Sequence, residues 1–96
     1  MSAYVIVNVE IQDTKSYTEY IRAAPASIAK FGGRYIARGG RTERLEGTWD
    51  PKRVVLLEFE TFERAREWWG SEDYAGPKAL RQACSITNMI LVEGVS

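Results

Sequence analysis

Glu58 is the residue of this sequence whose surroundings most favour acid–base chemistry. It lies near the end of an otherwise apolar run, RVVLLEF, at residues 53–59. Burying a carboxylate among apolar side chains is costly unless a cation pairs with it or it stays protonated. A desolvated Glu58 would have a raised pKa and would serve as the acid or base of a cavity. The alternative is a structural role near the strand end, solvated or paired with an arginine, and structural ion pairs are the more common outcome.

Arg38 is the expected partner of this carboxylate. Its planar guanidinium can bind a carboxylate substrate through two hydrogen bonds, or it can neutralise Glu58 or Glu93. Regular alternation along the strands would point four polar side chains to one face, namely Asn8, Arg38, Glu58 and Glu93. Such a group is typical of a small-molecule site, but it could equally be a hydrogen-bond network that fixes the register of a dimer. We take Glu58 and Arg38 as candidate catalytic residues and Asn8 as a candidate ligand contact.

The tyrosines and tryptophans on the predicted helices are Tyr17, Tyr20, Trp68, Trp69 and Tyr74. Aromatic residues at helical spacing usually belong to a core. Trp69, Tyr74 and Arg81 nevertheless lie near the Gly70–Ser71 pair, where the helix is expected to break. A mobile break would admit a flat ligand between the helices and the sheet. Tyr20 and Tyr74 would then orient the ligand and Arg81 would hold its acidic group, so these residues and Trp69 are the other candidate ligand contacts.

The composition argues against several other kinds of site. The chain has no histidine, which excludes His-based triads, His-ligated haem and His-metal sites. Its 13 basic and 13 acidic side chains balance, so the charge offers no basis for binding nucleic acid. The carboxylates lack a metal-ligand spacing and Gly39–Gly40 lacks that of a phosphate loop, so we expect no metal and no other cofactor.

The lone Cys84 is expected to be a buried, inert thiol, which fits a reducing cytoplasm. No apolar run approaches the length of a membrane span and the start of the chain does not resemble a signal peptide. We therefore expect a cytoplasmic protein without a membrane partner, built as one domain over residues 1–96.

The elements that must position these residues alternate in a recognisable order. Strands are predicted at residues 3–11, 34–38, 53–59 and 86–95, from runs of β-branched and apolar residues. One helix is predicted from Asp13 or Thr14 to Phe31, with a kink or break after Ala24 because Pro25 lies inside it. A second is predicted at residues 62–69 and continues, after the break, over residues 72–83. The order βαββαβ predicts a ferredoxin-like α+β sandwich, with a four-stranded antiparallel sheet and two helices on one face.

One face of such a sheet has no helical cover. We expect the helices to cover Val5, Val7, Val9, Val55, Leu57 and Phe59. The uncovered face is expected to carry Tyr4, Ile6, Ile36, Val54, Leu56, Met89 and Leu91. Leaving such side chains in water costs about 1.5–3 kcal/mol each, so the sequence predicts an obligate homodimer that packs two open faces together. Trp49, in the loop before the third strand, is expected to be a dimer contact.

Segments along nearly the whole chain resemble one family of small bacterial proteins. They are AYVIVNVEI, the Tyr17–Tyr20 helix with Ala24–Pro25 after it, FGGRYIARGG, LEGTWDPKRVVLLEF, TFERAREWWGSEDY and ILVEGV. The family is domain of unknown function thirteen-thirty, of the dimeric α/β-barrel superfamily. The resemblance implies the ferredoxin-like fold and a dimer, but no reaction, because the family's activity is unassigned.

The wider superfamily includes cofactor-free monooxygenases of antibiotic biosynthesis, muconolactone isomerases and haem-binding chlorite dismutases. The chain lacks the histidine with which the last group binds haem. Two hypotheses follow from the sequence. The first is a homodimer that binds a small aromatic or acidic metabolite and could act on it as a cofactor-independent enzyme, with Glu58 or a tyrosine transferring a proton. The second is a non-catalytic dimeric binding or interaction module in which the same polar residues are structural.

Overall fold

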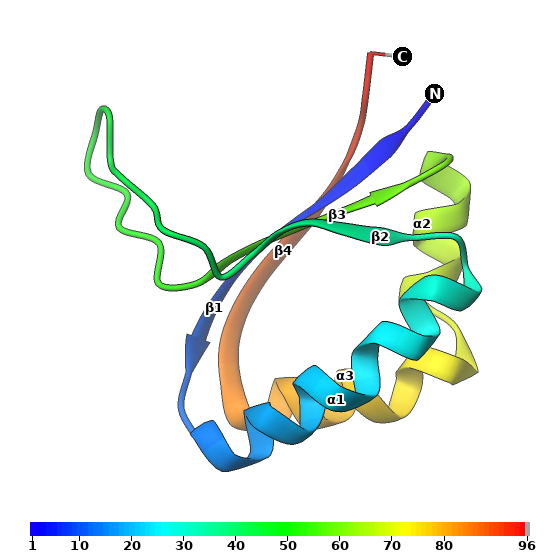
Figure 1. Cartoon of the computed structure of the whole chain (residues 1–96), viewed down its shortest axis with the longest axis horizontal. Coiled ribbons are helices and arrows are strands. Elements are labelled where there is room, and N and C mark those ends of the chain that lie inside the picture. The colour runs from blue at the N-terminus through cyan, green and yellow to red at the C-terminus, as the bar shows by residue number, and fades with distance from the viewer. Residues whose placement is uncertain (96) are drawn as a thin grey trace.

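Four antiparallel strands form one sheet, and three helices cover one of its faces (Figure 1). The structure, a computed structural model, describes residues 1–95. Its elements are β1 (Ala3–Ile11), α1 (Thr14–Lys30), β2 (Arg34–Arg38), β3 (Val54–Phe59), α2 (Phe62–Trp69), α3 (Glu72–Cys84) and β4 (Ser85–Glu93). The strands lie in the order β2-β3-β1-β4. This is the ferredoxin-like fold that the sequence predicted.

The helical layer has three helices because the second predicted helix is interrupted at Gly70–Ser71, as the sequence indicated. The Thr61 hydroxyl accepts a hydrogen bond from the Arg64 N–H and so caps α2. The Ser71 hydroxyl accepts from the Tyr74 N–H and caps α3. Each cap satisfies a backbone donor that the first turn of a helix leaves without a partner.

Helix α1 is continuous through Pro25, so the predicted break after Ala24 is wrong, while the alternative of a kink stays a prediction. Asp13 caps the helix by accepting from the N–H groups of Lys15 and Ser16. Proline removes one hydrogen bond from a helix interior, here the bond to the Ile21 carbonyl four residues earlier. The burial of Ala24, Ser27 and Ile28 on both sides of Pro25 keeps the helix packed on the sheet despite that loss.

The core lies between the helices and the odd-numbered residues of β1 and β3. Val5, Val7, Val9, Val55, Leu57 and Phe59 are all buried there, as predicted. The helices contribute Tyr17, Ile28, Trp68 and Tyr74. The Trp68 indole N–H donates to the Ser27 hydroxyl at 3.1 Å, so this buried polar group has a partner.

In strand β4, the side chains that face the helices are not the ones predicted. Met89 is opposite Val7 and Leu91 is opposite Val5, and both pack against the core. The open face instead carries Ile86, Ile90 and Val92, all of them exposed. A shift of one residue in a strand exchanges its two faces, and both sets of alternating residues in β4 are largely apolar. Tyr4, Ile6, Val54 and Leu56 do lie on the open face.

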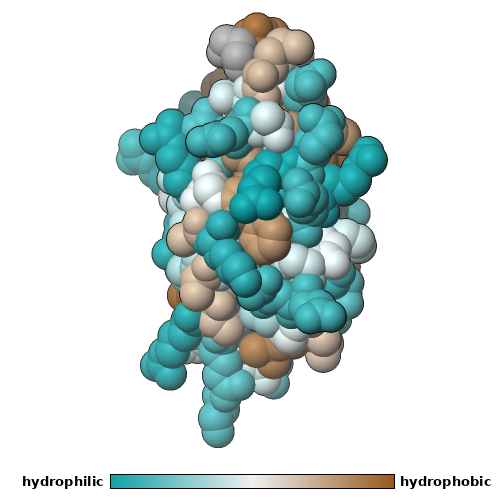
Figure 2. All heavy atoms as spheres, turned by 90° about the vertical axis from the view of Figure 1, so that its right-hand side faces the viewer, coloured by the Kyte–Doolittle hydropathy of each residue, from teal (hydrophilic) through white to brown (hydrophobic). Residues whose placement is uncertain are grey.

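A long connection between β2 and β3 leaves the body of the molecule (Figure 1). Residues 40–50 are all exposed, and the side chain of Trp49 is 63% accessible. The side of the molecule that carries α2 is covered mainly by hydrophilic side chains (Figure 2). Within residues 1–95, none of the helices combines the length and the apolar character that crossing a membrane requires.

Candidate functional site

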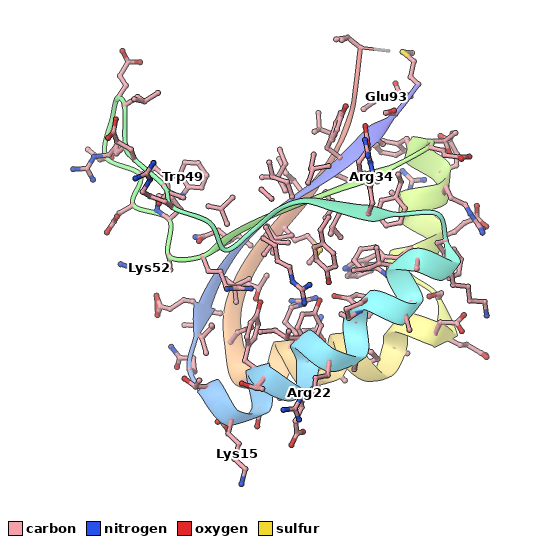
Figure 3. The ribbon with its side chains drawn as sticks, viewed as in Figure 1. Lys15, Arg22, Arg34, Trp49, Lys52 and Glu93 are labelled. Atoms are coloured by element: carbon pink, nitrogen blue, oxygen red, sulfur yellow. The ribbon has the colours of Figure 1, made fainter. Side chains whose placement is uncertain are left out.

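Glu58 is held in an ion pair on the open face of the sheet, but its partner is Arg34. The two residues are opposite each other in β2 and β3, and the Arg34 Nε–H donates to Glu58 Oε1 at 2.6 Å. Arg34 points away from the helical layer (Figure 3). Its hydrogen bond is the main cause that lowers the Glu58 pKa, which keeps this carboxylate ionised at neutral pH.

Arg38 does not meet Glu58, so the predicted pairing of these two residues is wrong. A bulge between Tyr35 and Ala37 inserts one residue into β2, and beyond it Arg38 lies opposite Val55. One extra residue changes the face to which all following side chains point. Arg38 is therefore on the helical side of the sheet, whereas Glu58 is on the open side.

Asn8 and Glu93 also do not join a common group with Glu58 and Arg38. Asn8 lies on the open face, where its side-chain oxygen accepts a hydrogen bond from the Lys52 backbone N–H at 2.8 Å. Asn8 thus anchors the end of the projecting loop to β1. Glu93 is opposite Ala3, on the helical side, and is exposed near the end of β4. The four side chains that were expected on one face of the sheet are therefore divided between its two faces.

A small cavity between the helices and the sheet brings together a different set of polar side chains. Its volume is about 30 Å³, which is room for a group of a few heavy atoms. Its polar lining consists of Arg38, Arg53, Arg81, Tyr17, Tyr20 and Tyr35, among apolar residues of β1, β3 and α1. Of the candidates from the sequence, Arg38, Tyr20 and Arg81 line this cavity, and Tyr74 bonds to the last two.

Arg81 is the most deeply buried of these cations, with 4% of its surface accessible. Its Nε–H donates to the Tyr74 hydroxyl at 3.2 Å, and the Tyr74 and Tyr20 hydroxyl oxygens are 2.6 Å apart. Burial raises the Tyr20 pKa, and the nearby Tyr74 raises it further. Tyr20 therefore keeps its proton at neutral pH and can donate a hydrogen bond but not accept a proton.

Arg53 is a cavity residue that the sequence analysis missed. Its Nε is buried and has no hydrogen-bond partner within residues 1–95. Its guanidinium carbon is 5.6 Å from the centre of the Tyr17 ring. The sequence did contain a signal for this position. Arg53, Val55 and Leu57 are alternate residues of one predicted strand, and Val55 and Leu57 were correctly predicted to lie under the helices.

Gly39 gives the Arg53 side chain its space. Gly39 has a φ of +67°, and a Cβ atom at this position would come within 2.7 Å of the Arg53 Cζ. A side chain here would be strained by the backbone and would also displace the guanidinium.

Arg38 is held at the cavity by two contacts. Its guanidinium carbon lies 4.3 Å from the centre of the Tyr35 ring. Its Nη2 donates to the Ile21 carbonyl at 3.3 Å. This is the carbonyl that Pro25 leaves without a helical donor, so the proline in α1 makes an acceptor available to Arg38.

The three cavity arginines have no acidic counterpart in the described part of the chain. None of the described residues that line the cavity is Asp or Glu, and the ion pairs within residues 1–95 do not involve Arg38, Arg53 or Arg81. Clustered cations without a counter-charge are unfavourable in a partly desolvated site. The arrangement is suited to an anion.

Trp69 lies apart from this cavity. It is 45% accessible, and the Lys78 ammonium is 3.8 Å from the centre of its ring. Cys84 is buried, and burial raises the pKa of its thiol, so it is not an activated nucleophile. Within residues 1–95 no cluster of three or more Asp, Glu, Cys or His residues could hold a metal ion.

The chain matches one family model in sequence and several solved structures in fold. The family model described as "Domain of unknown function (DUF1330)" matches residues 2–95. No curated protein matches. A crystal structure of a protein of unknown function from Rhodopseudomonas palustris is 17% identical, with a TM-score of 0.79 over 99% of this chain and 83% of that one.

Two further solved structures share the fold. SnoaB, a cofactor-independent oxygenase from Streptomyces nogalater, is 9% identical, with a TM-score of 0.68 over 99% of this chain and 94% of that one. A dimeric ferredoxin-like protein of unknown function from Jannaschia sp. is 11% identical, with a TM-score of 0.67 over 98% of this chain and all of the other. At these identities the likeness concerns the fold alone.

Proposed function

The chain belongs to the DUF1330 family, and we propose that it forms a homodimer in which each protomer binds a small carboxylic acid between its helices and its sheet. The observation that carries the proposal is the convergence of Arg38, Arg53 and Arg81 on one cavity without an acidic residue among its described lining. A guanidinium is the side chain best matched to a carboxylate, because its N–H groups can form two parallel hydrogen bonds with it.

The size and the hydrogen bonds of the cavity agree with a carboxylate head group. A volume of about 30 Å³ holds a few atoms rather than a whole metabolite. The unpartnered Arg53 Nε–H supplies one donor. Arg81 is fixed through its own Nε by Tyr74, which leaves its terminal N–H groups for a ligand. Binding an anion would offset the cost of burying the Arg81 cation, which has 4% of its surface accessible.

The same geometry favours binding over proton transfer. Glu58, the candidate acid or base, is ion-paired on the other face of the sheet. Tyr20, one of the tyrosines that line the cavity, has a raised pKa and stays protonated. Of the first hypothesis from the sequence, the binding of a metabolite therefore has better support than the proton transfer. SnoaB is an oxygenase, but its likeness to this chain extends only to the fold.

The homodimer is supported by the open face of the sheet. Ile86, Ile90 and Val92 are exposed beside the half-buried Ile6 and Leu56. An apolar face of this extent is typical of a subunit interface. Solved structures with the same fold from Jannaschia sp. and Bacteroides fragilis are described as dimeric.

The ligand proposal is tested by measuring thermal stabilisation with acetate, using chloride at the same ionic strength as the reference. Acetate should raise the Tm of the wild type, because a ligand that binds the folded state stabilises it. Arg38→Ala and Arg53→Gln should each weaken this stabilisation several-fold. Glu58→Gln, on the open face, is the matched control and should respond like the wild type. Equal responses to acetate and chloride, or unchanged responses in both arginine variants, would contradict the proposal.

A further inference from the structure

We call the small cavity lined by Arg38, Arg53 and Arg81 the carboxylate cavity. A larger hollow lies beside it, between β4 and the helices α2 and α3. Its volume is about 360 Å³, which is within the range of small-molecule sites, about 300–1,000 Å³. Its walls include Ala65, Trp68, Trp69, Met89 and Leu91, with Gln82 and Thr87 among its polar residues. We call this hollow the β4 groove.

The β4 groove and the carboxylate cavity share part of their lining. Trp68, Arg81 and Met89 line both hollows. Arg81 thus lies between the two hollows, with 4% of its surface accessible. Met89 is unbranched and can change rotamer without a movement of the backbone. The wall between the two hollows is therefore formed by Arg81, Trp68 and Met89. Of these three side chains, Met89 adapts most readily.

The chemistry of the two hollows is complementary. The cavity offers three cations and little space, whereas the β4 groove offers an apolar surface and enough room for a ring system. Trp69 is the exposed aromatic side chain of the groove, and Lys78 covers its ring at 3.8 Å. An indole is a favourable stacking surface for a flat aromatic group.

We infer that the ligand is an aryl-substituted carboxylic acid that occupies both hollows. Its carboxylate lies among Arg38, Arg53 and Arg81, its chain passes Met89, and its ring lies in the β4 groove against Trp69. This inference rests on the proposed function and specifies its ligand class. It also gives Trp69 a role, although that residue does not line the carboxylate cavity.

The test compares the affinities of acetate, phenylacetate and 2-naphthylacetate by NMR titration at constant ionic strength. In the wild type, phenylacetate should bind about tenfold more tightly than acetate, because its ring is removed from water. This gain should be lost in Trp69→Ala, and in Gln82→Trp, which fills the groove from an exposed position. Trp49→Ala, which removes an exposed indole far from the groove, is the matched control and should keep the gain.

The outcomes separate this inference from the proposed function. If acetate binds through the arginines but phenylacetate gains nothing, or if its gain survives in both groove variants, the inference is overturned and the proposed function stands. If phenylacetate binds through Trp69 with no effect of Arg38→Ala or Arg53→Gln, a ligand does not occupy both hollows and the inference is again overturned. If acetate does not bind at all, the proposed function fails and the inference fails with it.

Discussion

The Glu58–Arg34 ion pair makes the stability of the fold depend on pH. The folded state lowers the Glu58 pKa from an ordinary value of 4.5, so the pair stabilises the protein above about that pH. The stabilisation is lost as the pH falls through the lowered value. We expect Glu58→Gln to lower the Tm at pH 7 by less than about 4 °C, as for a surface pair, and to have a smaller effect at about pH 3. Thermal unfolding followed by circular dichroism at both pH values measures this, and a Tm difference that persists undiminished at pH 3 would contradict it.

Gly39 and Gly40 are neighbours with different structural demands, which allows a matched experiment. Ala at position 39 would adopt a φ of +67° and would also press on the Arg53 guanidinium. We expect Gly39→Ala to destabilise the fold by about 1–2 kcal/mol from the backbone alone, and to weaken acetate binding by displacing Arg53. Gly40→Ala should change neither property, because a Cβ there meets nothing within 4 Å. Chemical denaturation and an acetate titration measure both effects, and equal behaviour of the two variants would contradict the role given to Gly39.

At the scale of elements, Pro25 links the helix α1 to the carboxylate cavity. Ala at this position would donate its N–H to the Ile21 carbonyl, which now accepts from Arg38. We expect Pro25→Ala to weaken acetate binding by up to about tenfold, which is the value of one hydrogen bond, because the new N–H competes with Arg38 for the Ile21 carbonyl. The Tm should not fall, since alanine is the better helix former.

Pro77, inside α3, provides the control for this experiment. Pro77→Ala should leave acetate binding unchanged, because neither Pro77 nor the Asp73 carbonyl that it leaves free lines the carboxylate cavity. Equal acetate affinities for Pro25→Ala and the wild type, measured by NMR titration, would show that Arg38 does not depend on the Ile21 carbonyl.

The four strands differ in how much of their arrangement the sequence revealed. In β1 and β3 one alternating set is uniformly apolar, so the buried face followed directly from the pattern. In β4 both sets contain large apolar residues, so its face was decided by pairing with β1. In β2 the bulge lies among Tyr35, Ile36 and Ala37, where every residue is compatible with either face. That local irregularity moved Arg38 from the open face to the cavity, and with it the candidate site.

At the scale of the molecule, the candidate site is a product of packing that no single segment encodes. Tyr20, Tyr74 and Arg81 were expected to hold one ligand near the helix break at Gly70–Ser71, and the structure joins the three side chains by hydrogen bonds. Arg38, at the end of β2, and Arg53, just before β3, reach the same place. Their meeting depends on the bulge in β2 and on the register between β2 and β3, which are properties of the assembled sheet.

The open face of the sheet determines whether two copies of the chain associate. Leu56 lies near the centre of this face, opposite Ile6 in the neighbouring strand, so a charge there would be buried in a dimer. We expect the wild type to have the mass of two chains by light scattering at micromolar concentration, and Leu56→Asp to have the mass of one. Ala23→Asp, which places the same charge at an exposed position of α1, should remain dimeric.

Because Leu56→Asp also affects a central strand, the edge-strand variant Ile86→Asp is compared with it, and circular dichroism checks that each is folded. A folded wild type with the mass of a single chain at these concentrations would show that this face is covered by something other than a second copy.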